Sequence, residues 1–325
     1  MSVTPRELVG IKRMKSFGYL LLATLVAAPA FASIDRDVQK TFTVTPGGEL
    51  SVETNGGPIE VRASSTPQIE VTVHEHFRAS SDAEADEIAQ KNLDLKLEQT
   101  DKGVTVKAKC QSDGGGFWNW LSKSNVWVDV SVSVPSPYNA KLKTSGGGIR
   151  VEKLDGQLDA NTSGGPIELG KIEGKISAVT SGGGIKLEES EGDVKLNTSG
   201  GPIQVGKCHG NVNLDTSGGG IHVEAAAGVL HADTSGGGIH VHFVAALTGD
   251  SSLETSGGGI EVGLPKDKGV HVDASTSGGD VRLDGVEVTI ESGKINSSSL
   301  KGNVAGGGPT LRLRTSGGGI RISAN

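Results

Sequence analysis

The sequence predicts an all-β protein, a parallel β-solenoid (β-helix) whose rungs are about 18 residues long and contain two strands each. Two observations carry this prediction. The hexapeptide Thr-Ser-Gly-Gly-(Gly or Pro)-Ile recurs at intervals of 18 residues. Between its copies, apolar residues alternate with polar ones, as they do in strands. The regular copies begin at Thr144, Thr162, Thr180, Thr198, Thr216 and Thr234.

Residues 1–32 have the features of a secretory signal peptide, with Met14 as the true start. Lys15 precedes the apolar run 19–28, and a small-x-small ending predicts cleavage before Ser33. The apolar run is too short for a permanent membrane helix, and no later window reaches the roughly 20 apolar residues that such a helix needs. We therefore expect an exported protein of the periplasm, the cell surface or the extracellular space, with no transmembrane segment in the mature chain.

The charge of the chain argues against a nucleic-acid partner. The net charge is −7, and removal of residues 1–32, which hold four basic residues and one acidic residue, changes it to −10. Proteins that bind the nucleic-acid backbone need a basic surface. The 50 glycines recur at a fixed phase of the repeat, so they indicate turns rather than disorder.

Residues 33–143 are expected to form an N-terminal β-rich extension and cap. One helix is predicted from Ala83 to Leu93, with Ser81 or Asp82 as its N-cap. A solenoid needs such a cap because its first rung would otherwise expose an apolar edge. Alternating residues predict strands at 68–73, 103–107 and 126–132.

Residues 144–325 are expected to form the solenoid itself. In the first rung, Ile149 and Val151 face inward from one strand, and Leu158 and Ala160 face inward from the other. Equivalent positions in later rungs are also aliphatic. The sequence therefore predicts two facing apolar ladders with a spacing of about 4.8 Å.

Each rung is predicted to turn at two glycine corners. Glycine adopts positive φ without steric cost, so we expect positive φ at both corners. Pro58, Pro166 and Pro202 are expected to fix φ where the chain enters a strand. The first corner is the hexapeptide, and the second is a glycine at Gly156, Gly174, Gly192, Gly210 and Gly228.

The repeat becomes less regular toward the C-terminus. The interval between hexapeptides is 21 residues from Thr234 to Thr255 and again to the looser copy at Thr276, and then 39 residues to Thr315. We interpret the longest interval as two rungs, one of which lacks the motif.

The chain has two cysteines, Cys110 and Cys208. Export would permit a disulfide between them. Cys208, however, occupies a slot that is filled by Leu154, Ile172, Ser190 or Ala226 in other rungs, which is an inward or corner position. We therefore favour burial as small apolar side chains over a disulfide.

All three tryptophans lie in one short segment, which is the strongest local departure from the composition of the chain. They could seal the open end of the solenoid. Alternatively, an exposed glycine-flanked loop could stack on sugar rings or dock a partner. The candidate ligand-binding residues are Phe117, Trp118, Trp120 and Trp127.

Histidines occupy equivalent positions in successive repeats when the rungs are aligned. His222 and His240 share one outward slot, and Glu224 and His242 share the slot two residues later. Histidines with a carboxylate are a ligand set for zinc. The competing interpretation is a solvated face whose charge responds to pH. No cofactor is predicted.

The sequence offers no arrangement typical of an enzyme. We find no nucleophile with a base and an orienting group, and no pair of carboxylates in distinct environments. A polysaccharide-active enzyme would need a cleft of non-repeating charged residues, and only the irregular rungs from Asp280 to Thr315 offer a place for one.

The chain resembles a bacterial family of exported β-strand-repeat domains of unknown function whose members are provisionally named adhesins. The resemblance rests on FTVTPGGELSV (residues 42–52), on the Thr-Ser-Gly-Gly-x-Ile repeats and on GGGPTLRLRTSG (residues 306–317), and it covers nearly all of the mature chain. It implies a right-handed parallel β-solenoid at the cell envelope, with no established activity.

The expected function is therefore non-enzymatic: an adhesin-like binding protein or surface scaffold of unknown ligand. Its partner would be an envelope polysaccharide or a surface protein. Two alternatives stay open, a polysaccharide-active β-helix enzyme and a purely structural spacer.

Overall fold

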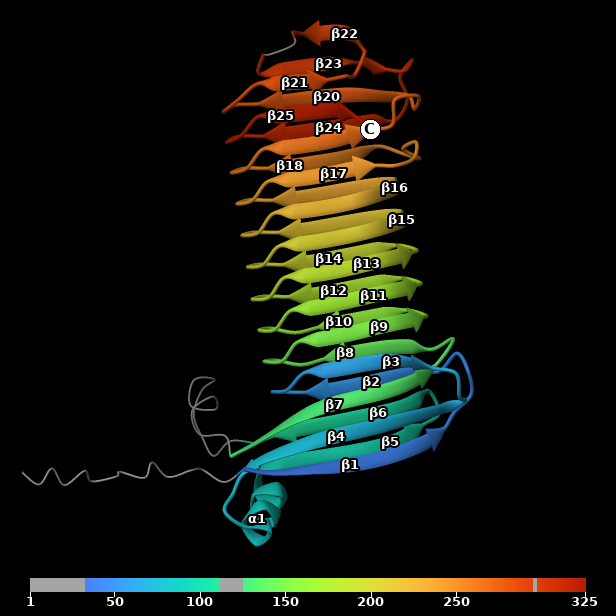
Figure 1. The fold of residues 1–325 in the computed structure, drawn as a ribbon, viewed down its shortest axis with the longest axis vertical. Helices are drawn as coiled ribbons and strands as arrows, with labels where there is room; N and C mark the ends of the chain where they lie inside the picture. Colours follow the sequence, from blue (N-terminus) through green and yellow to red (C-terminus); the bar gives the residue numbers. More distant parts are fainter. Residues whose placement is uncertain (1–32, 112–124, 295–296) are drawn as a thin grey trace, which may run out of the picture. The chain divides into compact units, whose positions relative to one another are not determined.

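The computed structural model describes residues 33–111, 125–294 and 297–325. These residues form 25 strands of one hydrogen-bonded sheet and one helix, which confirms the all-β prediction (Figure 1). The predicted signal peptide, residues 1–32, lies outside this part of the chain. None of the helical residues described is part of a helix long and apolar enough to cross a membrane.

The central part of the sheet is a stack of parallel strands (Figure 1). Ile167 lies opposite Ile149 in one neighbouring strand and Ile185 in the other, so stacked residues are 18 positions apart in sequence. The strands are β8 (Asn139–Lys143), β9 (Ile149–Asp155), β10 (Leu158–Asn161), β11 (Ile167–Glu173), β12 (Ile176–Thr180), β13 (Ile185–Glu191), β14 (Val194–Thr198), β15 (Ile203–Thr216), β16 (Ile221–Thr234), β17 (Ile239–Phe243), β18 (Ser251–Thr255) and β19 (Ile260–Leu264).

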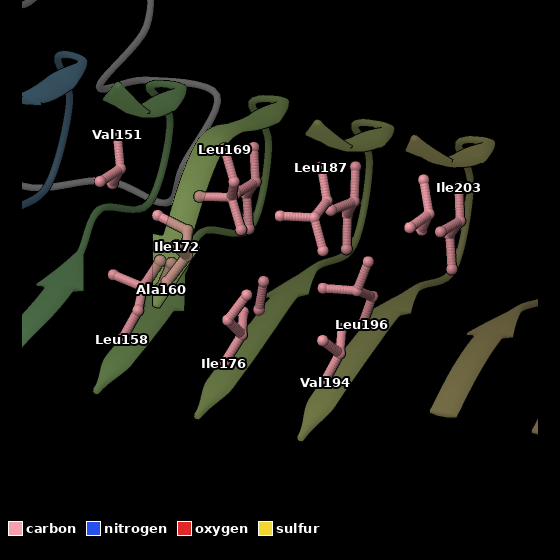
Figure 2. Close-up of a cluster of buried hydrophobic side chains, with 14 of the residues drawn as sticks. Val151, Leu158, Ala160, Leu169, Ile172, Ile176, Leu187, Val194, Leu196 and Ile203 are labelled. Carbon is pink, nitrogen blue, oxygen red and sulfur yellow. The ribbon is translucent and has the colours of Figure 1, made fainter. Parts of the chain in front are cut away.

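Aliphatic side chains from two columns of strands meet inside the stack (Figure 2). Each buried aliphatic side chain contributes about 1.5–3 kcal/mol relative to exposure. Because every rung adds a similar set, the stabilisation accumulates along the stack. Members of this core that are at most 2% exposed are Val151, Leu169 and Leu187 from β9, β11 and β13, and Leu158, Ile176 and Val194 from β10, β12 and β14.

The second corner of each rung has the backbone conformation that the sequence predicts. Its glycines have φ values between +121° and +150°, a region that residues with a Cβ rarely adopt. These glycines are Gly156, Gly174, Gly192, Gly210 and Gly228.

The hexapeptide turns need glycine for a different reason, so the expectation of positive φ was wrong there. Gly165 and Gly183 are not among the residues with positive φ. Instead, a Cβ at Gly165 would lie 2.3 Å from the carbonyl oxygen of Gly147, and a Cβ at Gly183 would lie 2.2 Å from that of Gly165. Successive turns approach too closely for any side chain.

The threonine that opens each hexapeptide links one turn to the next. Thr180 is 1% exposed, and its Oγ1 donates a hydrogen bond of 2.9 Å to the carbonyl oxygen of Gly165 in the preceding turn. Thr198 and Thr216 do the same to Gly183 and Gly201, at 2.7 and 2.9 Å. The hexapeptide therefore encodes a ladder of buried hydroxyl-to-carbonyl bonds along the stack.

The N-terminal end of the sheet combines antiparallel strands with two strands of the parallel stack. β2 (Glu49–Thr54) and β3 (Ile59–Ser64) pair in parallel with β8 and β9, although they precede the predicted boundary at residue 143. The placement of that boundary stays a prediction. The antiparallel pairs are β1–β4, β4–β7 and β5–β6, formed by β1 (Ser33–Thr43), β4 (Gln68–Arg78), β5 (Leu93–Thr100), β6 (Gly103–Cys110) and β7 (Val126–Pro135).

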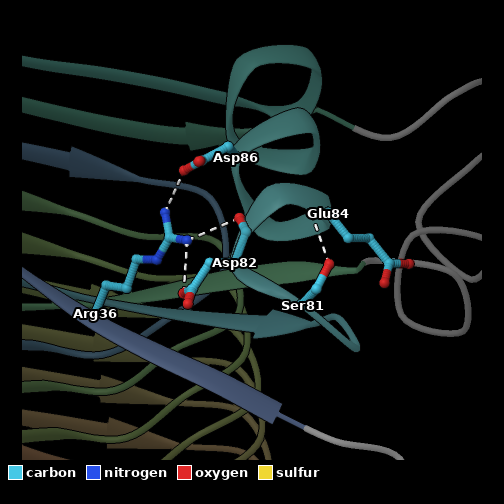
Figure 3. Close-up of polar contacts among 5 residues, drawn as sticks. All are labelled: Arg36, Ser81, Asp82, Glu84 and Asp86. Carbon is cyan, nitrogen blue, oxygen red and sulfur yellow. Dashed lines mark hydrogen bonds and ion pairs between the residues drawn. The ribbon is translucent and has the colours of Figure 1, made fainter.

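The predicted helix is present as α1 (Asp82–Asn92), one residue earlier at each end than expected. The Ser81 hydroxyl accepts a hydrogen bond from the Glu84 N–H, which confirms Ser81 as the N-cap (Figure 3). Arg36 of β1 joins the first turn to the sheet through the side chains of Asp82 and Asp86, at 3.1 and 2.5 Å.

At the C-terminal end, the order of strands in the stack differs from their order in the chain. β24 (Thr310–Thr315) lies between β18 and β20 (Val270–Thr276), and Thr315 is opposite both Thr255 and Thr276. β25 (Ile320–Ala324) lies in the same way between β19 and β21 (Val281–Asp284). The long interval was interpreted as two rungs, one without the motif; the structure shows that the rung after this interval, β24 and β25, returns to an earlier layer of the stack.

The stack ends in antiparallel strands here too. β23 (Ser299–Val304) pairs antiparallel with β20, and β22 (Val288–Gly293) pairs antiparallel with β23. Asp273 of β20, which is 9% exposed, contacts Arg314 of β24 and Lys301 of β23 at 2.8 and 3.2 Å.

Both cysteines are buried and unpaired, in agreement with the favoured prediction. Burial raises the pKa of the Cys110 thiol and of the Cys208 thiol to about 11. Neither thiol is therefore ionised to a useful extent near neutral pH.

Gly165→Ala is expected to lower the free energy of unfolding by about 2 kcal/mol or more, because its methyl group would overlap the Gly147 carbonyl. Gly164→Ala is the matched control, since its nearest contact would be 3.2 Å, and it should cost less than about 1 kcal/mol. Urea denaturation of both variants measures the difference. Equal losses would contradict the explanation by close approach.

Thr198→Val keeps the shape of the side chain but removes the hydroxyl that donates to Gly183. We expect a loss of about 1 kcal/mol or more, because a buried carbonyl then lacks its partner. Thr289→Val on the exposed strand β22 should change stability by less than about 0.5 kcal/mol. Comparable melting temperatures for the two variants would argue against the threonine ladder.

Asp273 should make the stability of the C-terminal end sensitive to acid. Burial opposes ionisation of this carboxyl, but hydrogen bonds from Arg314 and Lys301 outweigh burial and lower its pKa. A group with a lowered pKa stabilises the fold above its unfolded pKa of about 3.9 and loses this contribution as the pH falls through the folded value. Below about pH 4, the unfolding free energy should therefore decline more steeply in the wild type than in Asp273→Asn; parallel curves from urea titrations would refute this.

Candidate functional site

Trp127, one of the predicted ligand-binding residues, points away from the core on β7. Along this strand Val126, Val128 and Val130 are buried, whereas Trp127 and Asp129 alternate with them on the outer side and are half-buried. The alternation of valine with polar or aromatic residues thus places an indole on the outer surface of the N-terminal strands.

Two cationic or ionisable side chains of β4 hold the indole in place. His76 lies opposite Trp127 in the β4–β7 pair, and the two rings stack with centroids 5.2 Å apart and an interplanar angle of 17°. The guanidinium carbon of Arg78 lies 5.8 Å from the centroid of the Trp127 ring, within the range of a cation–π contact.

Carboxylates from β1 and β7 surround the two histidines of β4. Asp35 lies 2.8 Å from Nδ1 of His76, and Asp129 lies 3.4 Å from its Nε2. Asp37 lies 2.7 Å from Nδ1 of His74. We name this group of side chains the Trp127 patch: Trp127, His74, His76, Arg78, Asp35, Asp37 and Asp129.

A hollow of about 410 Å³ adjoins the Trp127 patch, and His74 and Asp129 belong to both. β7 also contributes Val130 and Ser131, and the remaining walls come from the first rungs of the stack, where Glu60, Arg150 and Glu168 supply charge and two prolines supply apolar surface. Arg150 pairs with Glu168 across neighbouring strands. The hollow thus continues the patch from the antiparallel strands onto the repeats.

This combination of groups suits a ligand with both apolar faces and hydroxyl groups. A half-buried indole offers a flat apolar surface. Around it, carboxylates accept hydrogen bonds and guanidinium groups donate them. Binding sites commonly pair apolar surface with a few well-placed polar groups in this way.

The other predicted aromatic residues, Phe117, Trp118 and Trp120, lie outside the described residues. Their segment follows Gln111 and ends three residues before Trp127 in sequence. Their part in binding stays a prediction.

On β16 and β17, His222 lies opposite His240 as predicted, but the strand register shifts between Val223 and Ala226, so Glu224 and His242 are not paired in the expected slot. The rings of His222 and His240 are 6.2 Å apart at a tilt of 51°. His240 contacts Glu261 through Nδ1 at 2.9 Å, and His242 contacts the Asn325 side chain through Nδ1 at 3.2 Å.

Glu224 is exposed on β16. Throughout the described part of the chain, no group of three or more His, Cys, Asp or Glu side chains is placed to hold a metal ion. Metal binding by His222, Glu224, His240 and His242 stays a prediction.

The sequence alone did not reveal most of the Trp127 patch. Alternation along residues 68–78 places His74 and His76 on one side of a strand, which is a usable signal. Asp35 and Asp37 could not be assigned to the same surface, because their approach depends on the antiparallel pairing of β1 with β4.

Several solved structures are similar to this chain at low identity. A provisionally named adhesin from Parabacteroides merdae has a TM-score of 0.40 and 12% identity, with 89% of this chain and 96% of that one covered. One from Bacteroides fragilis has a TM-score of 0.36 and 11% identity, with 89% and 97% covered. A provisionally named lipid-binding protein from Parabacteroides distasonis has a TM-score of 0.36 and 13% identity, with 88% and 96% covered.

No curated protein matches the sequence. One family model matches the sequence, and the match spans both the N-terminal strands and the repeats. The match extends over residues 48–323, from β2 to the last strand, and includes every hexapeptide. On this match the chain belongs to the Toastrack family, DUF4097.

Proposed function

We propose that this protein is a non-enzymatic, adhesin-like binding protein of the bacterial cell envelope, and that the Trp127 patch is its binding site. The observation that carries the proposal is the half-buried Trp127 ring, stacked on His76 and flanked by carboxylates beside a hollow. We favour an envelope polysaccharide as ligand over a surface protein.

A polysaccharide fits the chemistry of the patch. A sugar ring has an apolar face that stacks on an indole and hydroxyl groups that bond to Asp129, Arg150 or Glu168. Trp127 is supported by its contacts with His76 and Arg78, so little side-chain entropy would be lost on binding.

The proposal includes the architecture and location that the sequence predicts. The parallel stack is proposed to wind as a right-handed β-solenoid. Residues 1–32 are proposed to direct export as a signal peptide, which would bring the mature chain to the envelope. Phe117, Trp118 and Trp120, which lie outside the described residues, are proposed to take part in binding.

Trp127→Ala should weaken binding to purified envelope polysaccharide at least about tenfold, equivalent to about 1.4 kcal/mol, because the stacking surface is lost. Gln204→Ala is the matched control, an outward substitution on β15 that should leave binding unchanged. The measurement is the depletion of mature protein by increasing amounts of polysaccharide, with melting temperatures recorded to show that both variants fold.

Each other outcome selects a different interpretation. Undiminished binding by Trp127→Ala would remove the patch as the site, and a Trp118→Ala/Trp120→Ala variant would then test the neighbouring segment. Shortening of the glycan, detected by mass spectrometry, would favour the polysaccharide-active enzyme. No retention of the wild type would exclude this ligand and favour a protein partner or a structural spacer.

A further inference from the structure

The last rung of the chain fills a layer between two rungs that precede it in sequence. β24 and β25 pair in parallel with β18 and β19 below them and with β20 and β21 above them. The five residues 265–269 between β19 and β20 therefore pass over a complete layer. Without β24 and β25, this layer of the stack would be unoccupied.

The contacts of the last rung are those of an internal rung rather than of a loose end. Leu311, Leu313, Ile320 and Ile322 are at most 1% exposed. The threonine ladder runs through the rung in stack order, because Thr315 donates to Gly258 at 2.7 Å and Thr276 donates to Gly318 at 2.6 Å. The Asp273–Arg314 ion pair adds a polar contact to β20.

The segment that leads into the last rung has the features of a hinge. Ala305, with φ of +45°, is the one residue other than glycine with positive φ among those the structure describes. Gly306 and Gly307 follow with φ of +86° and +82°, and then come Gly308 and Pro309. Strained or short hinge segments favour exchange of the element that follows them.

An open layer would accept a strand of matching sequence. Without β24 and β25, the neighbouring strands would be about 9.6 Å apart, twice the strand spacing, with unpaired backbone groups facing the gap. The side chains lining the gap complement the last rung, whichever molecule supplies it. An extended segment that completes a sheet is a common mode of protein association.

We propose that the last rung, residues 310–325, can be donated to a second copy of this chain. In a reciprocal exchange, each copy opens at residues 305–309 and inserts its β24 and β25 between β18–β19 and β20–β21 of the other copy. The contacts of the exchanged rung are unchanged, and the strain at Ala305 is released. Such an exchange gives a closed two-fold dimer.

The test uses two variants of the mature chain, Ser252→Cys and Arg312→Cys, in a Cys110→Ala/Cys208→Ala background. Residues 252 and 312 are opposite each other in the β18–β24 pair, within reach of a disulfide. The variants are mixed, unfolded in urea, refolded together at high protein concentration and oxidised. The two variants are made with different chain masses, so that a heterodimer can be distinguished from a homodimer. Mass spectrometry of the linked peptides then shows whether the heterodimer is joined through residues 252 and 312.

The matched control is the pair Asn213→Cys and His231→Cys, which are opposite each other in β15 and β16, where stack order follows chain order. We expect the 252–312 heterodimer in several-fold greater yield than the 213–231 heterodimer, increasing with protein concentration. Equal yields, or no 252–312 heterodimer, would overturn the proposal.

A single-chain variant with both Ser252→Cys and Arg312→Cys verifies the geometry. It should form an internal disulfide when refolded at low concentration. If it does not, the last rung does not occupy the layer described above, and the proposal fails for that reason.

Discussion

The stack depends on one crowded contact, in which a threonine hydroxyl and a glycine α-carbon meet the same carbonyl oxygen. The carbonyl of Gly165 accepts the Thr180 hydroxyl at 2.9 Å, and a Cβ on Gly183 would lie 2.2 Å from it. Strand pairing fixes the distance between rungs, so no side chain can enter this contact. The threonine and the second glycine of the hexapeptide are therefore determined together.

That constraint leaves the outward positions free to vary, and the proposed binding site lies where the regular stack gives way to other pairings. At the N-terminal end, antiparallel strands bring residues from β1, β4 and β7 together around Trp127. The parallel rungs stack residues at repeat intervals, as in the His222–His240 pair, whereas the antiparallel pairings bring together segments that the repeat does not relate. The patch and the hollow beside it thus arise from the junction between the two kinds of strand pairing.

Local features of the fold were predictable from the sequence, whereas pairings between distant segments were not. The inward aliphatic ladders, the positive-φ corner at Gly156 and the N-cap Ser81 follow from residue type and spacing within a short stretch. The role of glycine in the hexapeptide turn was predicted wrongly, because glycine is required there by the close approach of the neighbouring rung and not by the local backbone conformation. Only the 39-residue interval before Thr315 hinted that the last rung leaves the chain order.

The antiparallel strands at both ends also bear on fibril growth. A regular parallel stack presents, at each end, a template on which further identical layers could add without limit. Here β1 pairs with β4 and β22 pairs with β23 in antiparallel fashion, and charges such as Asp35, Asp37 and Glu291 lie on these edge strands. An incoming parallel layer would meet the wrong hydrogen-bond pattern and charged side chains, so the stack of parallel rungs is not extended at these edges by further layers.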